Sequence, residues 1–151
     1  MECKICNHAG SVIRDYEGFY VATASNPVSD GHVTIICKEH KPFAALNSDE
    51  FRMVAKIVKS TFTALTMVFR PDATKLIIEN GEMQNLGFFE LYIIEGVPFE
   101  MDNLDECSGH MHIEIIPCYS DLSKFNAGRK PFGAEKDKDI AAEIKRVMDV
   151  E

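Results

Sequence analysis

The chain contains no long apolar run and no run of lysine or arginine. A membrane-spanning helix needs about 18 or more consecutive apolar residues, and no segment approaches that length, so we expect no membrane partner. The net charge is −8 and the isoelectric point is near 5.1. An acidic chain without a basic run argues against a protein that tracks the phosphates of DNA or RNA. A small phosphorylated ligand is compatible with this negative charge, because helix ends and backbone amides bind anions whatever the total charge of the chain.

Cysteine is present in an odd number, so the five cysteines cannot all pair with one another. The first residues are polar and charged, and we therefore expect no signal peptide. Both features favour a reducing, cytoplasmic location. In such a compartment the pair Cys3 and Cys6, spaced as Cys-x-x-Cys, more often binds a metal or performs redox chemistry than forms a structural disulfide.

The length and composition predict one folded domain over residues 1–151. Apolar residues make up 46% and charged residues 26% of the 151 positions, which is typical of a globular chain that buries roughly two-thirds of its unfolded surface. The sequence shows no internal repeat, low-complexity segment or linker.

Apolar and β-branched segments bounded by turn-forming residues predict short strands. They lie at residues 11–15, 18–24, 32–37, 75–79 and 109–117. Asn47 followed three residues later by Glu50 predicts the start of an amphipathic helix of about six turns, which Arg70 and Pro71 end. A second helix is predicted at residues 135–150. This mixture predicts an α+β domain.

The strand at residues 109–117 carries two of the five histidines of the chain. Alternate residues on a strand point to one face, so His110, His112 and Glu114 share a face. Met111, Ile113 and Ile115 point to the other face, towards a core. Two imidazoles and a carboxylate in a row suit phosphoryl chemistry or metal binding. The alternative is a pair of histidines on a solvated strand face.

This strand resembles the signature of the histidine-triad (HIT) superfamily, His-φ-His-φ-His-φ-φ, where φ is apolar. Glu114 stands in place of the third histidine, where the galactose-1-phosphate uridylyltransferase branch of the superfamily has glutamine. The segment at residues 31–40 is similar to the Gly-His-x-φ-φ-φ-Pro-Lys-x-His strand of the family, with Cys37 where proline is usual. Residues 1–6 resemble the Cys-x-x-Cys of its zinc-containing members. The resemblance implies a HIT-like antiparallel sheet of about five strands with one long central helix and a C-terminal helix. It also implies a homodimer.

The resemblance implies that His112 is a nucleophile on the α-phosphorus of a nucleotide, oriented by a strand carbonyl. The implied function is a nucleotidyl hydrolase or transferase that acts on a nucleoside phosphoramidate, a dinucleoside polyphosphate or a nucleotide ester. Glu114 departs from the family, because an ionised carboxylate repels a phosphoryl group. It helps only if burial raises its pKa and keeps it protonated, if it orients another donor, or if it pairs with a lysine such as Lys38. Altered chemistry, slow hydrolysis and a zinc-stabilised nucleotide-binding protein without turnover all stay open.

The resemblance also implies a structural zinc ion bound by Cys3, Cys6, His40 and His110. A closed site of four ligands would tie the amino terminus to the sheet and leave no place for substrate. His8 or His32 in place of His40, and cysteines that bind no metal or act as a redox pair, are alternatives. A further possibility is a zinc-dependent hydrolase that uses His110, His112 and Glu114 as ligands.

Two residues are candidate phosphate contacts. Asn80 lies in a segment that resembles the Phe-Glu-Asn-x-Gly of the uridylyltransferase branch, whose asparagine contacts the phosphate; the alternative is a plain turn. The hydroxyl of Ser108 could donate to the phosphate or the leaving group, or simply begin the strand. Residues 82–107 would be an insertion relative to the family.

Overall fold

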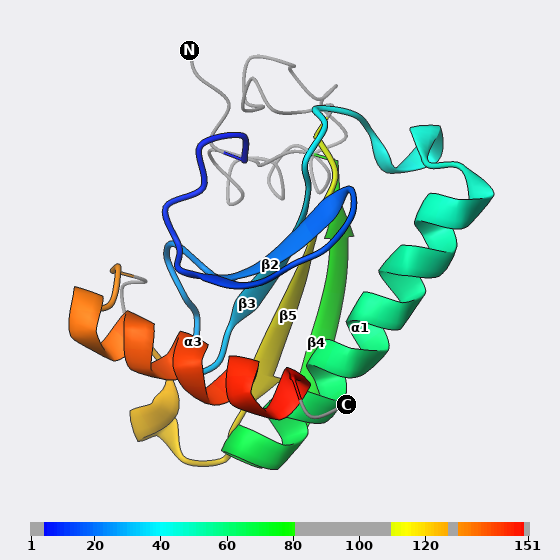
Figure 1. The fold of residues 1–151 in the computed structure, drawn as a ribbon. Coiled ribbons are helices and arrows are strands. Elements are labelled where there is room, and N and C mark those ends of the chain that lie inside the picture. The colour runs from blue at the N-terminus through cyan, green and yellow to red at the C-terminus, as the bar shows by residue number, and fades with distance from the viewer. Residues whose placement is uncertain (1–4, 81–109, 127–129, 150–151) are drawn as a thin grey trace, which may run out of the picture.

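The computed structural model describes residues 5–80, 110–126 and 130–149, which contain a single five-stranded antiparallel sheet in the order β1-β2-β3-β5-β4 (Figure 1). The strands are β1 (Val12–Asp15), β2 (Phe19–Thr23), β3 (Val33–Cys37), β4 (Ala73–Glu79) and β5 (His112–Cys118). All five predicted strands are present, although β5 begins at His112 and not at residue 109. The predicted α+β class, with an antiparallel sheet of five strands, one long helix and a C-terminal helix, is confirmed.

Two α-helices accompany the sheet, α1 (Ser48–Phe69) and α3 (Ala134–Met148), with the short 3-10 helices η1 (Phe43–Ala45) and η3 (Leu122–Lys124) in the connections. The predicted start of α1 is confirmed. The side chain of Asn47 accepts a hydrogen bond from the Glu50 amide, and the Glu50 carboxylate accepts one from the Asn47 amide. This capping box satisfies two amide groups that a helix start leaves unpaired.

One face of the sheet forms the main core with both helices. Ile113 and Ile115 of β5 are fully buried there, against Ile57 and Leu65 of α1 and Ile144 of α3. The long helix runs alongside the sheet, and α3 crosses near the lower end of the strands in the view of Figure 1. The predicted direction of the isoleucines is therefore correct, and it leaves the histidines on the opposite face.

The opposite face carries polar side chains beside a small apolar cluster. Residues directly opposite each other on paired strands share a face, and the register pairs Glu114 with Thr34 on β3 and His112 with Glu79 on β4. Ile5 packs on Ile36 next to this polar row, so the amino-terminal segment lies over part of the same face.

Gly31 fixes the entry of the chain into β3. Its φ of +88° lies in the left-handed region, and a β-carbon at this position would come within 2.8 Å of the ring of Phe69. Both constraints favour glycine, which lets the helix end pack against the turn that presents His32.

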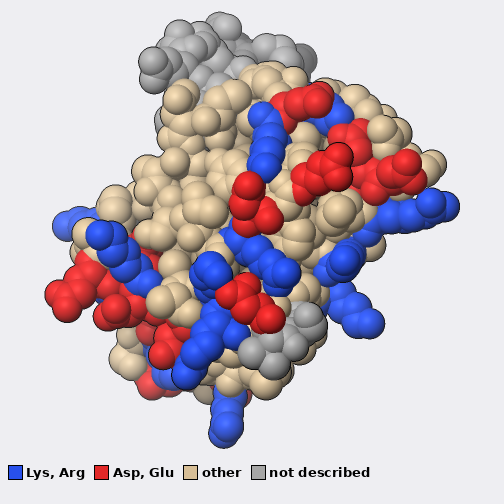
Figure 2. Space-filling view, viewed as in Figure 1, with Lys and Arg blue, Asp and Glu red and all other residues tan. Residues whose placement is uncertain are grey.

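Parts of the sequence predictions lie outside the described residues. These parts are the insertion at residues 82–107 together with Ser108 and Cys3, and the extent of the single domain also stays a prediction. No helix within the described ranges has the length and apolarity to cross a bilayer. On the face seen in Figure 2, basic and acidic side chains are intermixed over the part of the surface that the structure describes.

Strand β4 forms one end of the sheet and exposes a row of apolar side chains. Leu76, Ile77 and Ile78 are 41%, 40% and 47% exposed, and no described strand pairs with the outer edge of β4. Proteins rarely leave an apolar edge strand open, because its unpaired amides and carbonyls are a template for another chain. Among the described residues this edge is therefore a surface that a further strand could pair with.

We predict that the dimer forms through β4. The double substitution Leu76→Lys/Ile78→Lys places two charges on the edge, and we expect it to convert a species of twice the 17.0 kDa chain mass into a monomer. Light scattering after size-exclusion chromatography measures the mass. Val12→Lys, on the edge strand at the other end of the sheet and 60% exposed, is the matched control. A wild-type monomer, or a variant that stays dimeric, would contradict this prediction.

Candidate functional site

A groove with a volume of about 1070 Å³ opens on the polar face of the sheet. Thr34, Ile77, Glu79, His112 and Glu114 line it from the strands, and the segment from Pro131 to Lys138 at the start of α3 lines it from the other side. This volume lies slightly above the usual range for small-molecule sites in proteins, which is about 300–1,000 Å³. The groove therefore has room for a nucleotide joined to a second group.

His112 lines the groove from β5 and is buried, with 3% of its surface exposed. Its Nδ1 lies 3.4 Å from the backbone carbonyl oxygen of His110, which can only accept, so Nδ1 carries a proton. The predicted strand carbonyl is thus found beside the ring. In the neutral imidazole, Nε2 then holds a lone pair. Nε2 lies 3.7 Å from Oε1 of Glu79 and 4.0 Å from Oε1 of Glu114.

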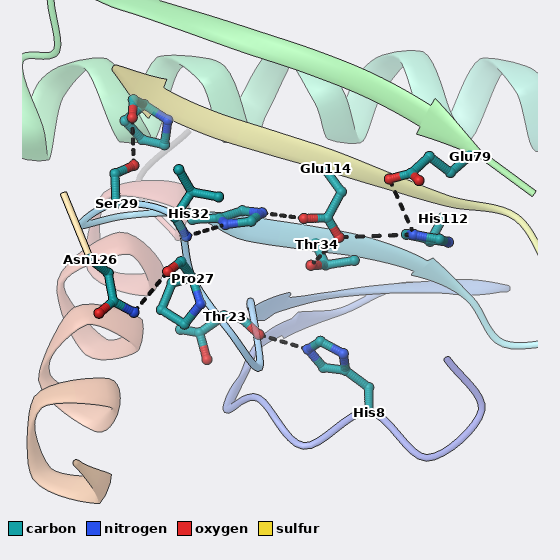
Figure 3. A network of polar contacts seen from close by, with 12 residues as sticks. His8, Thr23, Pro27, Ser29, His32, Thr34, Glu79, His112, Glu114 and Asn126 are labelled. Atoms are coloured by element: carbon teal, nitrogen blue, oxygen red, sulfur yellow. Dashed lines mark hydrogen bonds and ion pairs between the residues drawn. The ribbon is translucent and has the colours of Figure 1, made fainter. Parts of the chain in front are cut away.

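Glu114 is held from its other side by two residues of the neighbouring chain segment. Thr34 donates its hydroxyl to Oε1 at 3.0 Å, and Nε2 of His32 contacts Oε2. The amide of Val28 donates to Nδ1 of His32 at 3.0 Å, so the proton of the neutral ring is on Nε2 and is donated to Glu114. Figure 3 shows Glu114 lying between the rings of His32 and His112.

These contacts fix the charge of Glu114. Burial alone would raise its pKa, but the hydrogen bond from His32, the nearby imidazoles and the hydroxyl of Thr34 outweigh burial, and the net effect lowers the pKa below its usual value. Of the ways in which Glu114 could help that the sequence left open, a raised pKa that keeps it protonated is therefore not favoured. The pairing with Lys38 is wrong too, because that ammonium lies 2.7 Å from Asp15 and donates to the carbonyl of Tyr16.

A second cluster lies just before β5, where Cys6, His40 and His110 meet. Sγ of Cys6 is 3.2 Å from Nδ1 of His110 and 3.4 Å from Nδ1 of His40. The three atoms lie within 4.8 Å of one another, which makes this a possible metal site. A thiolate and two imidazoles are ligands that zinc prefers.

The orientation of His110 fits the role of a metal ligand. Its Nε2 donates to the carbonyl of Cys37 at 2.7 Å, which leaves the lone pair on Nδ1 directed at Cys6. Carbonyls that fix a ligand histidine in this way are usual around protein metals. Burial lowers the pKa of His110, and His40 and His112 nearby lower it further, so the neutral form that binds metal is favoured.

The structure places the other predicted residues as follows. Asn80 accepts a hydrogen bond from the Phe43 amide at 2.7 Å, so its carbonyl oxygen anchors η1. His8 contacts the carbonyl of Thr23 and His32 contacts Glu114, so neither of these alternative ligands joins Cys6. The proposed ligand set of His110, His112 and Glu114 is not assembled, because Nδ1 of His110 faces Cys6.

Glu79 is the site residue that sequence reasoning missed. It lay within a predicted strand, and its place beside His112 follows from the pairing of β4 with β5. More than thirty residues separate β4 from β5 in the sequence. The length of this connection does not predict which residue of β4 pairs with His112.

Comparisons with known proteins identify the fold. No family model matches the chain, and no curated protein matches it. Among solved structures, a hypothetical histidine triad nucleotide-binding protein from Sulfolobus tokodaii is 20% identical, with a TM-score of 0.69 over 98% of this chain and 93% of that chain. A zinc-bound histidine triad family protein from Mycobacterium smegmatis is 16% identical, with a TM-score of 0.63 over 100% and 99% of the two chains.

A third similar structure is the diadenosine triphosphate hydrolase of Plasmodium falciparum. It is 15% identical, with a TM-score of 0.64 over 93% of this chain and 78% of that chain. At these identities the likeness establishes the fold. The chain has the histidine-triad fold, as its signature strand predicts, and its structural neighbours are proteins of that superfamily.

We predict a pH-dependent stabilisation from Glu114. Because its pKa in the folded state lies below the unfolded value of about 4.5, the stabilisation is fully present above pH 4.5 and is lost as the pH falls through the folded-state pKa. Glu114→Gln removes the charge and should lower the free energy of unfolding by about 1–3 kcal/mol at pH 7. Urea denaturation of both proteins between pH 7 and pH 3 should show the difference shrinking below pH 4.5. A difference that is constant or grows on acidification would contradict the prediction.

Proposed function

We propose that the protein is a nucleotidyl hydrolase or transferase that works through a covalent nucleotidyl-histidine on His112. Its substrate would be a nucleoside phosphoramidate, a dinucleoside polyphosphate or a nucleotide ester. The observation that carries the proposal is the His112 ring itself. The His110 carbonyl holds its Nδ1 proton, while Nε2 lies in a groove large enough for a substituted nucleotide. The names of two structural neighbours, one nucleotide-binding and one a hydrolase, support the same class of substrate.

The chemistry proceeds in two displacements. The Nε2 lone pair of His112 attacks the α-phosphorus, the bond from phosphorus to the leaving atom breaks, and the electron pair departs with that atom, which takes up a proton from solvent. Water, or an acceptor alcohol or phosphate, then attacks the same phosphorus. The phosphorus–Nε2 bond breaks, its electron pair returns to the ring, and the attacking oxygen loses a proton. The His110 carbonyl stabilises the ring while Nε2 is bonded to phosphorus, because it accepts from Nδ1 throughout.

The ionised carboxylate of Glu114 slows this reaction. Two unit charges about 5 Å apart repel by about 3 kcal/mol at an effective dielectric of about 20, which corresponds to roughly a hundredfold in rate. The same repulsion energy leads to the alternative function, a nucleotide-binding protein. If the repulsion is not offset, the protein binds a nucleotide with little or no turnover.

We predict that the wild-type protein forms a covalent adduct with a nucleoside phosphoramidate in a single-turnover experiment. The adduct should be labile to acid and stable to base, as a phosphohistidine is, and His112→Ala should abolish it. Glu114→Gln removes the repulsion and should form the adduct about tenfold faster or more. Rapid quenching followed by mass spectrometry of the intact protein measures the adduct.

The controls separate the enzyme from the binding protein. The thermal midpoint of His112→Ala must stay close to that of the wild type, so that a lost adduct reports chemistry and not unfolding. Tight nucleotide binding by the wild type with no adduct and no product would support the alternative function and exclude the proposed one.

We also propose that zinc is a structural ion of this protein, held by Cys6, His40 and His110, with Cys3 as the fourth ligand. The three described ligands fit a zinc ion, because their soft or borderline donor atoms lie within 4.8 Å of one another and the Cys37 carbonyl orients His110. The ion would join the amino-terminal segment to the ends of β3 and β5. A zinc-bound structural neighbour with the same fold supports this assignment.

We predict about one zinc ion per chain by elemental analysis of the purified protein. Removal by a chelator, or the substitution Cys6→Ser, should lower the thermal midpoint by about 10 °C or more, because the binding free energy of a structural metal is part of the folding free energy. Cys118→Ser, at a half-buried thiol in β5, is the matched control and should keep the zinc. Loss of activity on chelation without a change in the midpoint would instead indicate a catalytic metal.

A further inference from the structure

The amino-terminal segment lines the groove with a histidine that the proposed reaction does not use. His8 is half-buried and belongs to the groove lining. Its Nε2 lies 2.7 Å from the backbone carbonyl oxygen of Thr23, which can only accept, so Nε2 carries a proton. In the neutral imidazole, Nδ1 then holds a lone pair. This nitrogen points away from Thr23 in Figure 3, and no other residue in the described part of the chain forms a hydrogen bond with His8.

The register of the sheet gives the separation between His8 and the proposed nucleophile. His112 pairs with Ile36 on β3, and Ile36 pairs with Tyr20 on β2. The carbonyl that holds His8 belongs to Thr23, three residues further along β2. With paired strands about 4.8 Å apart and residues about 3.4 Å apart along a strand, the backbones of Thr23 and His112 are about 14 Å apart. A nucleotide with its α-phosphorus at His112 would therefore meet His8 with its base, because its ribose lies too close to the phosphorus.

The surroundings of His8 suit a neutral ring. Ala24 and Phe132 supply apolar surface beside Thr23 and also line the groove. Asp137 and Lys138, at the start of α3, line it with opposite charges, so together they add little net charge. An apolar lining with a few placed polar groups is typical of sites that hold the ring of a small molecule. This end of the groove therefore favours a base over a second phosphate.

We propose that His8 is a specificity-determining residue that selects nucleotides with an amino group on the base, and that adenine is the base it takes. This inference rests on the proposed function, which places the α-phosphorus at His112. Adenine carries its amino group on the edge furthest from the ribose, where the group can donate to Nδ1 of His8. A purine with hydrogen at the same position leaves this nitrogen without a donor, and a site built around a hydrogen bond rejects a ligand that lacks it.

The affinities of two nucleoside monophosphates for the wild-type protein test the inference. Adenosine 5′-monophosphate has the amino group, and purine riboside 5′-monophosphate has hydrogen in its place on the same ring system. We expect the first to bind at least fivefold more tightly by isothermal titration calorimetry at pH 8. His8→Ala and His8→Phe should each reduce this ratio to less than twofold. A merely structural defect would instead weaken both ligands equally and keep the ratio.

Lys138→Gln, at another residue of the groove lining, is the matched control and should keep the wild-type ratio even if both affinities fall. Equal affinities of the wild type for the two ligands, tighter binding of the purine riboside, or a ratio that persists without His8 would overturn the role of His8 and leave the proposed function standing. The absence of measurable binding of either nucleotide would overturn both. The wild-type comparison needs no substitution, so it tests the inference even if a variant fails to fold.

Discussion

The position of β5 between β3 and β4 is the constraint on which the rest of the structure depends. Backbone hydrogen bonds on both sides of β5 fix its register, and a shift by one residue would exchange the two faces of the strand. The register that buries Ile113 and Ile115 in the core therefore also places His112 beside Glu79 and Glu114 beside Thr34. The free energy that orients the site comes from apolar burial on the far side of the same strand.

Glutamate at the third position of the signature is accommodated by its neighbours. A buried carboxylate without partners would be costly, but Thr34 and His32 both donate to Glu114. The Val28 amide makes His32 a donor by occupying its other nitrogen, and Gly31 allows the turn that precedes it. The chain thus stabilises a negative charge where a phosphoryl enzyme usually places a neutral or positive group.

Much of the fold could be predicted from local patterns. The alternation of residues in the signature strand predicted which side chains face the core and which face the site. The capping pair Asn47 and Glu50 predicted the start of α1. Both signals depend only on residues that are close together in the chain. The placement of Glu79 and the donor role of His32 could not be predicted, because each depends on how distant strands pair. The charge of Glu114 was left open by the sequence for the same reason, since its pKa follows from partners outside its own strand and not from burial alone.

The possible metal site and the proposed nucleophile share one residue, and this joins the two sites physically. The side chain of His110 presents Nδ1 to Cys6 and donates Nε2–H to Cys37, while the backbone carbonyl of the same residue accepts from Nδ1 of His112. A ligand that restrains the His110 side chain also restrains this carbonyl, because the two are attached to one α-carbon just before β5 begins. The metal would therefore act on catalysis through geometry, by keeping the acceptor that sets the tautomer of His112 in place. In this arrangement a structural ion needs no contact with substrate to influence the reaction.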